Sequence, residues 1–259
     1  MDTVAILQAR MSSSRLPGKV MADVVGKPML ALQIERLRKS AMISRLVVAT
    51  SDQPDDDCLV ALCSELNVEC WRGSLDDVLD RFYRVAVKAS ASSIVRLTGD
   101  CPLCDPKVID SAIYLHQNGQ YDYTSNTIER TWPQGLDVEV IEFPKLEEIW
   151  RDASLPSERE HVTLRVYNHL DRYKVGKLRN PKGDFSHLRW TVDEDKDLSL
   201  IREIYSSLYA VSPNFGTEEI LNLMVTRPEL RNLNKDIDRE AGLKKSIARD
   251  REFLAREKT

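Results

Sequence analysis

Three basic side chains and three serines crowd into one short stretch near the start of the chain. Arg10, Arg15 and Lys19 lie close together in sequence, with Ser12–Ser14 and Gly18 among them. Arginine and lysine bind phosphate oxygens, and successive backbone N–H groups near a glycine can form a cradle for an anion. This stretch predicts a site for several negative charges, most simply the phosphates of a nucleotide.

The elements around this stretch support that prediction. An apolar run, Val4–Leu7, predicts a first strand just before it, and a helix is predicted after it over Pro28–Ser40. In an open α/β sheet, ligands bind beyond the carboxyl ends of the strands. The spacings of a Walker A loop (GxxxxGK[ST]) and of a dinucleotide-binding turn (GxGxxG) are both absent, which argues against a P-loop NTPase and a nicotinamide-binding domain.

The wider hydrophobic pattern predicts an α/β protein with a mostly parallel, mixed sheet flanked by helices. We expect one domain over residues 1–235, in which residues 120–190 form a mixed region, and a charged helical C-terminal tail over residues 236–259. The predicted strands are Val4–Leu7, Leu46–Thr50, Val68–Trp71, Ser93–Leu97, Tyr121–Ser125, Val138–Glu142, Tyr173–Leu178 and Leu188–Val192; the predicted helices are Pro28–Ser40, Pro54–Leu66, Leu75–Ser90, Pro106–Gln117, Pro144–Asp152, Glu158–Asn168, Leu198–Tyr209 and Thr217–Thr226.

Composition limits the classes of protein that fit. The 259 residues are 42% hydrophobic and 30% charged, as in an ordinary soluble globular protein. A formal net charge of −4 gives no general attraction to nucleic acid or an anionic membrane, so neither is expected as a partner. With no membrane-length apolar run and no cleavable signal pattern, we expect a cytoplasmic protein. The five cysteines, including the CxxC pair Cys101 and Cys104, are expected to be reduced and structural.

Two aspartates follow predicted strands directly. Asp100 comes after Ser93–Leu97, and Asp193 comes after Leu188–Val192. Because Asp105 precedes a proline, it is the better N-cap for the next helix, which leaves Asp100 free. Mg²⁺ takes one or two carboxylates together with substrate phosphates, so Asp100 beside a phosphate loop predicts a magnesium site. Asp193 could close that site or could instead cap the following helix, a role that two later aspartates could also take.

A series of short blocks from Ala5 to about Asn234 resembles the cytidylyltransferases that activate acidic sugars, above all the spore coat polysaccharide biosynthesis protein F group. That group is related to the 3-deoxy-manno-octulosonate and acylneuraminate cytidylyltransferases. The sialic-type enzymes carry Gly-Gly-Ser-Lys in the first loop, whereas Met11–Arg15 stands here, which is nearer the octulosonate branch and leaves the acceptor open. The blocks are Gln8–Ser12, Arg15–Lys19, Gly26–Pro28, Val48–Ser51, Arg72–Ser74, Asp76–Arg81, Arg96–Pro102, Ser125–Thr127, Gly135–Glu139, Ser157–Thr163 and His187–Asp193.

The resemblance implies a nucleotide-diphospho-sugar transferase fold of the glycosyltransferase-A kind. It implies transfer of CMP from CTP to a 2-keto-3-deoxy sugar acid of the octulosonate or nonulosonate type, with release of pyrophosphate, for a surface polysaccharide or glycan. Mg²⁺ is implied on Asp100 and Asp193. The implied catalytic residues are Arg10, Arg15, Lys19 and Asp100, and the implied nucleotide-binding residues are Gln8, Ala9, Arg10, Ser14, Arg15, Lys19, Ser74, Arg81, Thr98 and Asp100.

Polar residues of the mixed region are the candidates for binding the acidic sugar. Arg159 could pair with the acceptor carboxylate, although it could equally belong to a solvated helix start capped by Ser157. His161 is a candidate general base because histidine titrates near neutral pH, although a single histidine is more often structural. Related enzymes are commonly dimers, and we expect a homodimer through Phe143–Tyr173. The candidate acceptor residues are Asn126, Gln134, Asp137, Glu139, Arg159 and His161.

Two other functions stay open from the sequence. One is a nucleotide-sugar-dependent glycosyltransferase of the same fold. Such enzymes usually hold their metal through an Asp-x-Asp motif, whereas Gly99-Asp100-Cys101-Pro102 stands at that position and favours nucleotidyl transfer. The other is a non-catalytic nucleotide-binding protein, which would need the first loop but not both Asp100 and Asp193.

Overall fold

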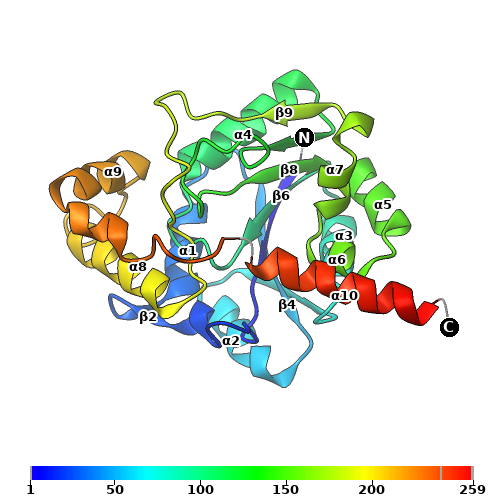
Figure 1. The fold of residues 1–259 in the computed structure, drawn as a ribbon, viewed down its shortest axis with the longest axis horizontal. Helices are drawn as coiled ribbons and strands as arrows, with labels where there is room; N and C mark the ends of the chain where they lie inside the picture. Colours follow the sequence, from blue (N-terminus) through cyan, green and yellow to red (C-terminus); the bar gives the residue numbers. More distant parts are fainter. Residues whose placement is uncertain (1, 240, 258–259) are drawn as a thin grey trace.

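The structure, a computed structural model, describes residues 2–239 and 241–257 and contains a seven-stranded sheet between two layers of helices (Figure 1). A small two-stranded ribbon, β2 (Asp23–Val24) and β3 (Lys27–Pro28), lies outside that sheet. The sheet has the strand order β5-β4-β1-β6-β8-β7-β9. Its strands are β1 (Thr3–Gln8), β4 (Arg45–Ser51), β5 (Glu69–Gly73), β6 (Ser93–Thr98), β7 (Tyr123–Ser125), β8 (Glu139–Glu142) and β9 (Val175–Lys177).

The order of the strands creates a crevice at one edge of the sheet. β1, β4, β5 and β6 are parallel, whereas β8 runs antiparallel to both β6 and β7, so the predicted mixed, mostly parallel sheet is confirmed. The chain passes from β1 outward to β5 and then returns to β6 on the other side of β1. Such a reversal opens a crevice beyond the carboxyl ends of the two strands. Gln8 and Thr98 pair there, which brings the first loop beside Asp100.

The strand residues alternate between two hydrophobic cores. Ala5 and Leu7 belong to one core and Val4 and Ile6 to the other, because successive side chains of a strand point to opposite faces. The first face is covered by α1 (Met29–Leu37), α2 (Asp57–Glu65), α4 (Pro106–Gly119), α8 (Asp195–Leu208) and α9 (Thr217–Thr226), and the second by α3 (Val78–Lys88), α5 (Phe143–Asp152) and α7 (Leu164–Asn168).

None of the helices in residues 2–239 and 241–257 is long and apolar enough to cross a bilayer.

Two helices far apart in sequence pack against each other. α6 (Pro156–Glu160) lies beside α10 (Ala241–Glu257), which is the red helix of Figure 1. α10 therefore reaches back from the end of the chain to the middle of the fold. Four 3₁₀ helices complete the described elements: η1 (Lys19–Met21), η2 (Pro54–Asp56), η3 (Leu170–Arg172) and η4 (Pro228–Asn232).

Most predicted strands and helices are present with small shifts at their ends, but two predictions are wrong. Glu158–Asn168 is not one helix but parts of α6 and α7. Between them Val162 has a φ of +36°, outside the right-handed region that a helix requires. Leu188–Val192 is not a strand, because the segment makes only an isolated bridge between Arg189 and Gln134.

A glycine nevertheless fixes the segment that was expected to be a strand. The Trp190 N–H donates to the Gln134 carbonyl over 2.6 Å. Gly135 has a φ of +105°, and a Cβ atom there would lie 2.5 Å from backbone atoms of Trp190 and Thr191. Because only glycine tolerates this approach, position 135 sets the path of the chain that leads to Asp193.

Candidate active site

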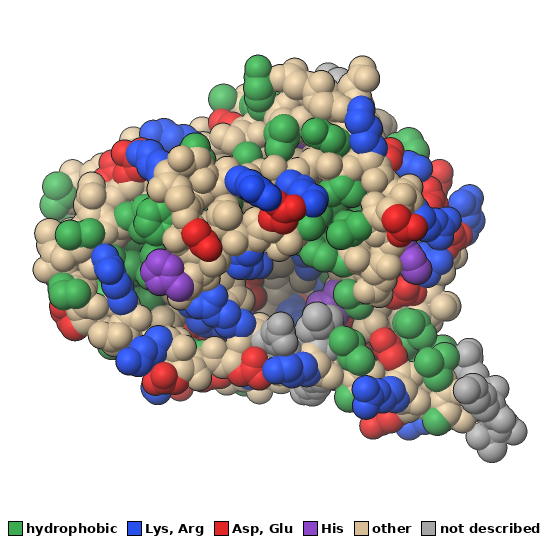
Figure 2. Space-filling view, turned by 45° about the horizontal axis from the view of Figure 1, so that its top comes forward, with side chains coloured by type: hydrophobic (Ala, Val, Ile, Leu, Met, Phe, Trp, Pro, Cys, Tyr) green, Lys and Arg blue, Asp and Glu red, His purple; other side chains and the backbone are tan. Residues whose placement is uncertain are grey.

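A cavity of about 430 Å³ opens at the carboxyl ends of β1 and β6. Figure 2 shows the face of the molecule hollowed near its centre, with basic side chains gathered around the hollow. Among the described residues, six basic and four acidic side chains line the cavity. The lining residues are Gln8, Ala9, Arg10, Ser12, Ser13, Ser14, Arg15, Lys19, Val20, Leu75, Asp76, Val78, Arg81, Arg96, Thr98, Gly99, Asp100, Glu160, His161, Asp193, Ser246 and Arg249.

The first loop is held in place by a buried carboxylate. The Met11 N–H donates to Asp56 Oδ1 over 2.7 Å, and Asp56 also accepts from the backbone and side chain of Ser51. The Gly18 N–H closes the loop onto the Met11 carbonyl over 2.9 Å. Gly18 has a φ of +74° and precedes η1, so Lys19 begins a turn at the cavity wall. Asp56 falls within the predicted helix Pro54–Leu66, and the sequence pattern did not indicate this anchoring role.

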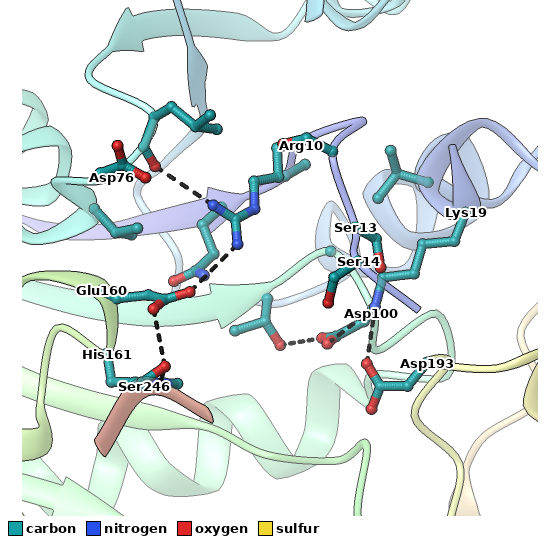
Figure 3. Close-up of a pocket in the computed structure, with 18 of the residues that line it drawn as sticks. Arg10, Ser13, Ser14, Lys19, Asp76, Asp100, Glu160, His161, Asp193 and Ser246 are labelled. Carbon is teal, nitrogen blue, oxygen red and sulfur yellow. Dashed lines mark hydrogen bonds and ion pairs between the residues drawn. The ribbon is translucent and has the colours of Figure 1, made fainter. Parts of the chain in front are cut away.

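Lys19 joins the two predicted metal ligands (Figure 3). Its Nζ lies 3.0 Å from Asp193 Oδ1 and 3.5 Å from Asp100 Oδ2, and it donates to the Val192 carbonyl over 2.6 Å. Burial alone lowers the pKa of Lys19, but the Asp100 and Asp193 carboxylates more than offset this effect and raise its pKa. The structure therefore brings together the three side chains that the sequence placed at separate strand ends.

Asp193 is surrounded by cations. Its Oδ2 lies 2.8 Å from both Arg15 and Arg189. Burial alone raises the pKa of Asp193, but Lys19 and Arg15 hold that pKa below its usual value. Asp197 is fully buried, pairs with Arg189 and accepts the N–H groups of residues 193 and 194 at the start of α8. Since Asp197 takes the capping role, Asp193 is left for the cavity.

The two carboxylates differ in how many cations they contact. Asp193 has a basic partner on each oxygen, whereas Asp100 Oδ1 accepts from Thr98 Oγ1 over 2.5 Å and Oδ2 lies 3.5 Å from Lys19. No group of three or more acidic, histidine or cysteine side chains suited to a metal ion occurs within residues 2–239 and 241–257. Mg²⁺ bound by one or two carboxylates and substrate phosphates needs no such group, so this donor set fits it, with Asp100 the more available ligand.

The opposite side of the cavity is built from α6 and α10. Arg10 lies 3.5 Å from Glu160, and Arg249 lies 3.4 Å from the same carboxylate. Ser246 Oγ is 2.9 Å from Glu160 Oε2 and 2.9 Å from His161 Nε2. Burial, together with the nearby Arg96 and Arg10 guanidinium groups, lowers the pKa of His161, so its imidazole is neutral at pH 7. We call this region, with Arg96, the Glu160 end, and the region of Arg15, Lys19, Asp100 and Asp193 the Lys19 end.

Several cavity-lining side chains keep buried polar atoms without a hydrogen-bond partner in the described part of the chain: Gln8 Oε1, Arg15 Nη1, Arg81 Nε and Arg96 Nε. Buried polar atoms in folded proteins are nearly always paired, so these point to a bound ligand. Arg81 donates to the Ser74 carbonyl over 2.6 Å. Burial and the neighbouring Arg10 lower the pKa of Arg81 to about 10, which leaves it charged at neutral pH.

Nine of the ten residues predicted to bind the nucleotide line the cavity. Ser74 is the exception, and its carbonyl accepts a hydrogen bond from Arg81, which lines the cavity.

Among the cysteines, Cys101 and Cys104 are buried, and burial raises the pKa of both thiols, that of Cys104 to about 12. Protonated, enclosed thiols suit the structural role expected for them.

The candidate acceptor residues are less well placed, since only His161 among them lines the cavity. Asn126 instead bonds the Leu136 carbonyl and the Val138 N–H. The other four are engaged elsewhere: Gln134 accepts from Arg189, Asp137 pairs with Arg130, Arg159 pairs with Asp77, and buried Glu139 pairs with Arg96.

Sequence reasoning missed four residues of the Glu160 end. Arg96 lies in a block that carried the resemblance, and its placement on the strand beside Asp100 was a usable signal. Glu160 gave a weaker signal, as one of several charges at a helix start. Ser246 and Arg249 gave none, because only the packing of α10 against α6 brings them to the cavity.

The sequence model of the Cytidylyltransferase family matches residues 4–215, most of the chain. The chain belongs to this family. This cytidylyltransferase is 36% identical over 236 residues to the spore coat polysaccharide biosynthesis protein SpsF of Bacillus subtilis, covering 88% of this chain and 96% of SpsF. It is 37% identical over 113 residues to the 3-deoxy-manno-octulosonate cytidylyltransferase of Geobacter metallireducens, covering 44% of each chain.

The fold of the cytidylyltransferase agrees with that of a solved relative. A cytidylyltransferase from Leptospira borgpetersenii superposes with a TM-score of 0.85 at 29% identity, covering 92% of this chain and 98% of that one. The predicted α/β fold, with a mostly parallel, mixed sheet flanked by helices, and the predicted cytidylyltransferase class are therefore confirmed. The matched family region ends at residue 215, before α10.

Proposed function

We propose that this cytidylyltransferase transfers CMP from CTP to a 2-keto-3-deoxy sugar acid and releases pyrophosphate. The observation that carries the proposal is the convergence of Arg15 and Lys19 with Asp100 and Asp193 at the carboxyl ends of β1 and β6. This cluster pairs a cationic loop for phosphates with carboxylates for a metal ion. The octulosonate enzyme named above supports an acidic sugar as acceptor, and the spore coat relative supports a role in surface polysaccharide synthesis.

The proposed step is a displacement at phosphorus. The anomeric hydroxyl of the sugar acid attacks the α-phosphorus of CTP, so that a new P–O bond forms, the bond to the bridging oxygen breaks and pyrophosphate leaves. The hydroxyl proton is released to solvent or to a base. Negative charge on the departing and non-bridging oxygens is stabilised by Arg10, Arg15 and Lys19. Asp193 holds Arg15 and Lys19 in place before substrate arrives.

A magnesium ion would bind at the Lys19 end. Asp100 and Asp193 would hold it, and it would supply electrostatic stabilisation of the triphosphate charge. Lys19, which contacts both carboxylates, would keep them close together whether or not the ion is bound. The first-loop cations, unlike the metal ion, would also orient the triphosphate.

A panel assay tests the proposed reaction. CTP, UTP, ATP and GTP are each combined with several 2-keto-3-deoxy sugar acids, and pyrophosphate release is measured. We expect release with CTP that depends on a sugar acid and on Mg²⁺. Turnover of preformed nucleotide-sugars without pyrophosphate release would show a glycosyltransferase instead.

Calorimetry of CTP binding tests the metal separately. We expect binding of CTP to strengthen when Mg²⁺ is added, and Asp100→Asn to remove that strengthening. Asp52→Asn is the matched control, because Asp52 is an exposed carboxylate beyond the neighbouring strand β4 and does not line the cavity. CTP binding that is indifferent to Mg²⁺ would contradict the proposed metal site.

A further inference from the structure

Helix α10 is docked by a buried polar clamp. Asp250 Oδ1 accepts the Ser157 N–H over 2.9 Å, and Asp250 Oδ2 accepts the Ser157 hydroxyl over 2.5 Å. Both residues are buried, although a carboxylate is seldom buried without such partners. The clamp fixes α10 on α6 at a defined position, which puts Ser246 and Arg249 at the wall of the cavity.

The ion pairs that α10 helps to form are loose. Arg10 and Arg249 lie 3.5 and 3.4 Å from Glu160, whereas Arg15 lies 2.8 Å from Asp193 at the opposite end. The side chain of Arg249 is 52% exposed. The guanidinium groups at the Glu160 end therefore keep N–H donors that a ligand could use.

Among the described residues, three basic side chains meet two carboxylates, Glu160 and Glu139, at this end of the cavity. Arg10, Arg96 and Arg249 come from the first loop, β6 and α10. Arg96 pairs with buried Glu139, yet its Nε has no hydrogen-bond partner within the described residues. Because Arg10 is already assigned to the triphosphate, Arg96 and Arg249 are the described basic side chains that remain at the Glu160 end for a second anion.

We propose that the Glu160 end is the subsite for the acid group of the acceptor, and that α10 is the element that determines this specificity. Arg249 and Arg96 bind the carboxylate, since a guanidinium presents paired donors that match a carboxylate. Ser246, placed between Glu160 and His161, orients the two side chains that border the bound acid. The proposal rests on the proposed function in that the acceptor is taken to be a sugar acid.

Two measurements on Arg249→Ala test the subsite. One is calorimetric binding of 3-deoxy-manno-octulosonate and of a sialic-type nonulosonate, which needs no turnover. The other is the KM for the acceptor and for CTP in the pyrophosphate assay. We expect acid binding to weaken and the acceptor KM to rise by about 10-fold, the lower part of the range for a hydrogen bond to a charged group because Arg249 is half exposed. The KM for CTP is expected to stay within about 2-fold.

Two further variants separate the subsite from a general effect on folding. Arg251→Ala removes an exposed cation of the same helix that does not line the cavity, and it should leave both KM values unchanged. Arg249→Lys, which keeps the charge but loses the paired donors, should recover part of the acid binding. Thermal unfolding of each variant checks that α10 remains docked.

The outcomes separate this inference from the proposed function. A rise in the KM for CTP instead of the acceptor, or no change in either, would overturn the subsite and leave CMP transfer standing. Failure of the wild-type protein to bind any sugar acid would also overturn it. Acid binding that depends on Arg249, without pyrophosphate release from any nucleotide, would overturn the proposed function and leave the subsite standing.

Discussion

At the Lys19 end of the cavity, Asp193 has cations within 3.0 Å on both of its oxygens, whereas at the Glu160 end two arginines lie 3.4 to 3.5 Å from one carboxylate. The first end is assembled by strand ends and by the buried pair of Arg189 and Asp197. The second end is assembled by α6 and α10, together with Arg10 of the first loop and Arg96 of β6. The short ion pairs of the Lys19 end fix the positions of its side chains before substrate binds, which suits a phosphoryl-transfer step common to every acceptor. The longer pairs of the Glu160 end leave N–H donors for a ligand that can vary.

The largest expected effect comes from the buried support of the Lys19 end. Asp197→Ala leaves the buried Arg189 without its main partner, which should reduce the free energy of unfolding by about 3–5 kcal/mol. Urea unfolding measures this change. Asp195→Ala, at an exposed position in the same first helical turn, is the matched control. Equal, small losses for both variants would show that the Lys19 end is not held by this pair.

A loss of catalysis is expected from the Lys19 end itself. Asp100→Asn should lower kcat about 10²–10³-fold, the loss typical of removing one group that stabilises transition-state charge. The measurement is the pyrophosphate assay at saturating Mg²⁺. Near-normal turnover would refute the assignment of Asp100, and a comparable loss in Asp52→Asn would show that the effect is not specific to the cavity.

A gain of acceptor affinity is expected from the Glu160 end. Glu160→Gln removes the carboxylate that Arg10 and Arg249 now contact, so a sugar acid no longer competes with it. Because partly exposed ion pairs are weak, the acceptor KM should fall only about 2- to 5-fold. Glu147→Gln, an exposed change on α5 away from the cavity, should have no effect. A higher acceptor KM in Glu160→Gln would mean that Glu160 itself binds the sugar.

The smallest effect concerns pH. The pKa of the half-buried His161 is lowered below 6.5, so its neutral form is favoured in the fold. Its contribution to stability is present above pH 6.5 and is lost as pH falls from 6.5 toward the lowered pKa. The groups facing His161 are Glu160, Arg96, Arg10 and Asp250, and the pKa of Glu160 is itself held low.

Asp193 titrates in a different range. Its pKa lies below 3.8, so its contribution is lost only as pH falls below 3.8. Between pH 7 and 5 the Glu160 end should therefore weaken while the Lys19 end does not. Urea unfolding of His161→Gln should show a shallower loss of stability than wild type over this range, and His169→Gln should follow wild type. A shallower loss in Asp193→Asn as well would remove the distinction between the two ends.

The two ends also differ in how far they could be predicted from the sequence. Arg10, Arg15 and Lys19 are neighbours along the chain and follow a strand, so their meeting point depends only on local order. Asp100 could be predicted because it also follows directly after a predicted strand, whose carboxyl end lies at the same edge of the sheet. Asp193 was placed correctly even though the strand before it was wrong, because Gly135 rather than sheet pairing fixes that segment.

The Glu160 end depends on contacts between distant segments. Nothing local indicates that Ser157 clamps Asp250, 93 residues later, and so the position of Arg249 could not be predicted. The candidate acceptor residues raise a different problem for prediction, because they are polar but are bonded within the fold. Asn126 directly follows β7 and Glu139 begins β8. Asn126 bonds backbone groups of residues 136 and 138, and Glu139 pairs with the partly buried Arg96. Sequence pattern does not reveal whether a polar side chain is satisfied internally.

Gly135 also bears on which substitutions the protein can accept over time. It does not line the cavity, yet its missing side chain allows the backbone of Trp190 to approach, and Asp193 follows three residues later. A single methyl group there, as in Gly135→Ala, would move a carboxylate that it never touches. Position 135 should therefore tolerate almost no substitution. Substitutions in α10, by contrast, should be tolerated and should change the range of sugars that the enzyme accepts.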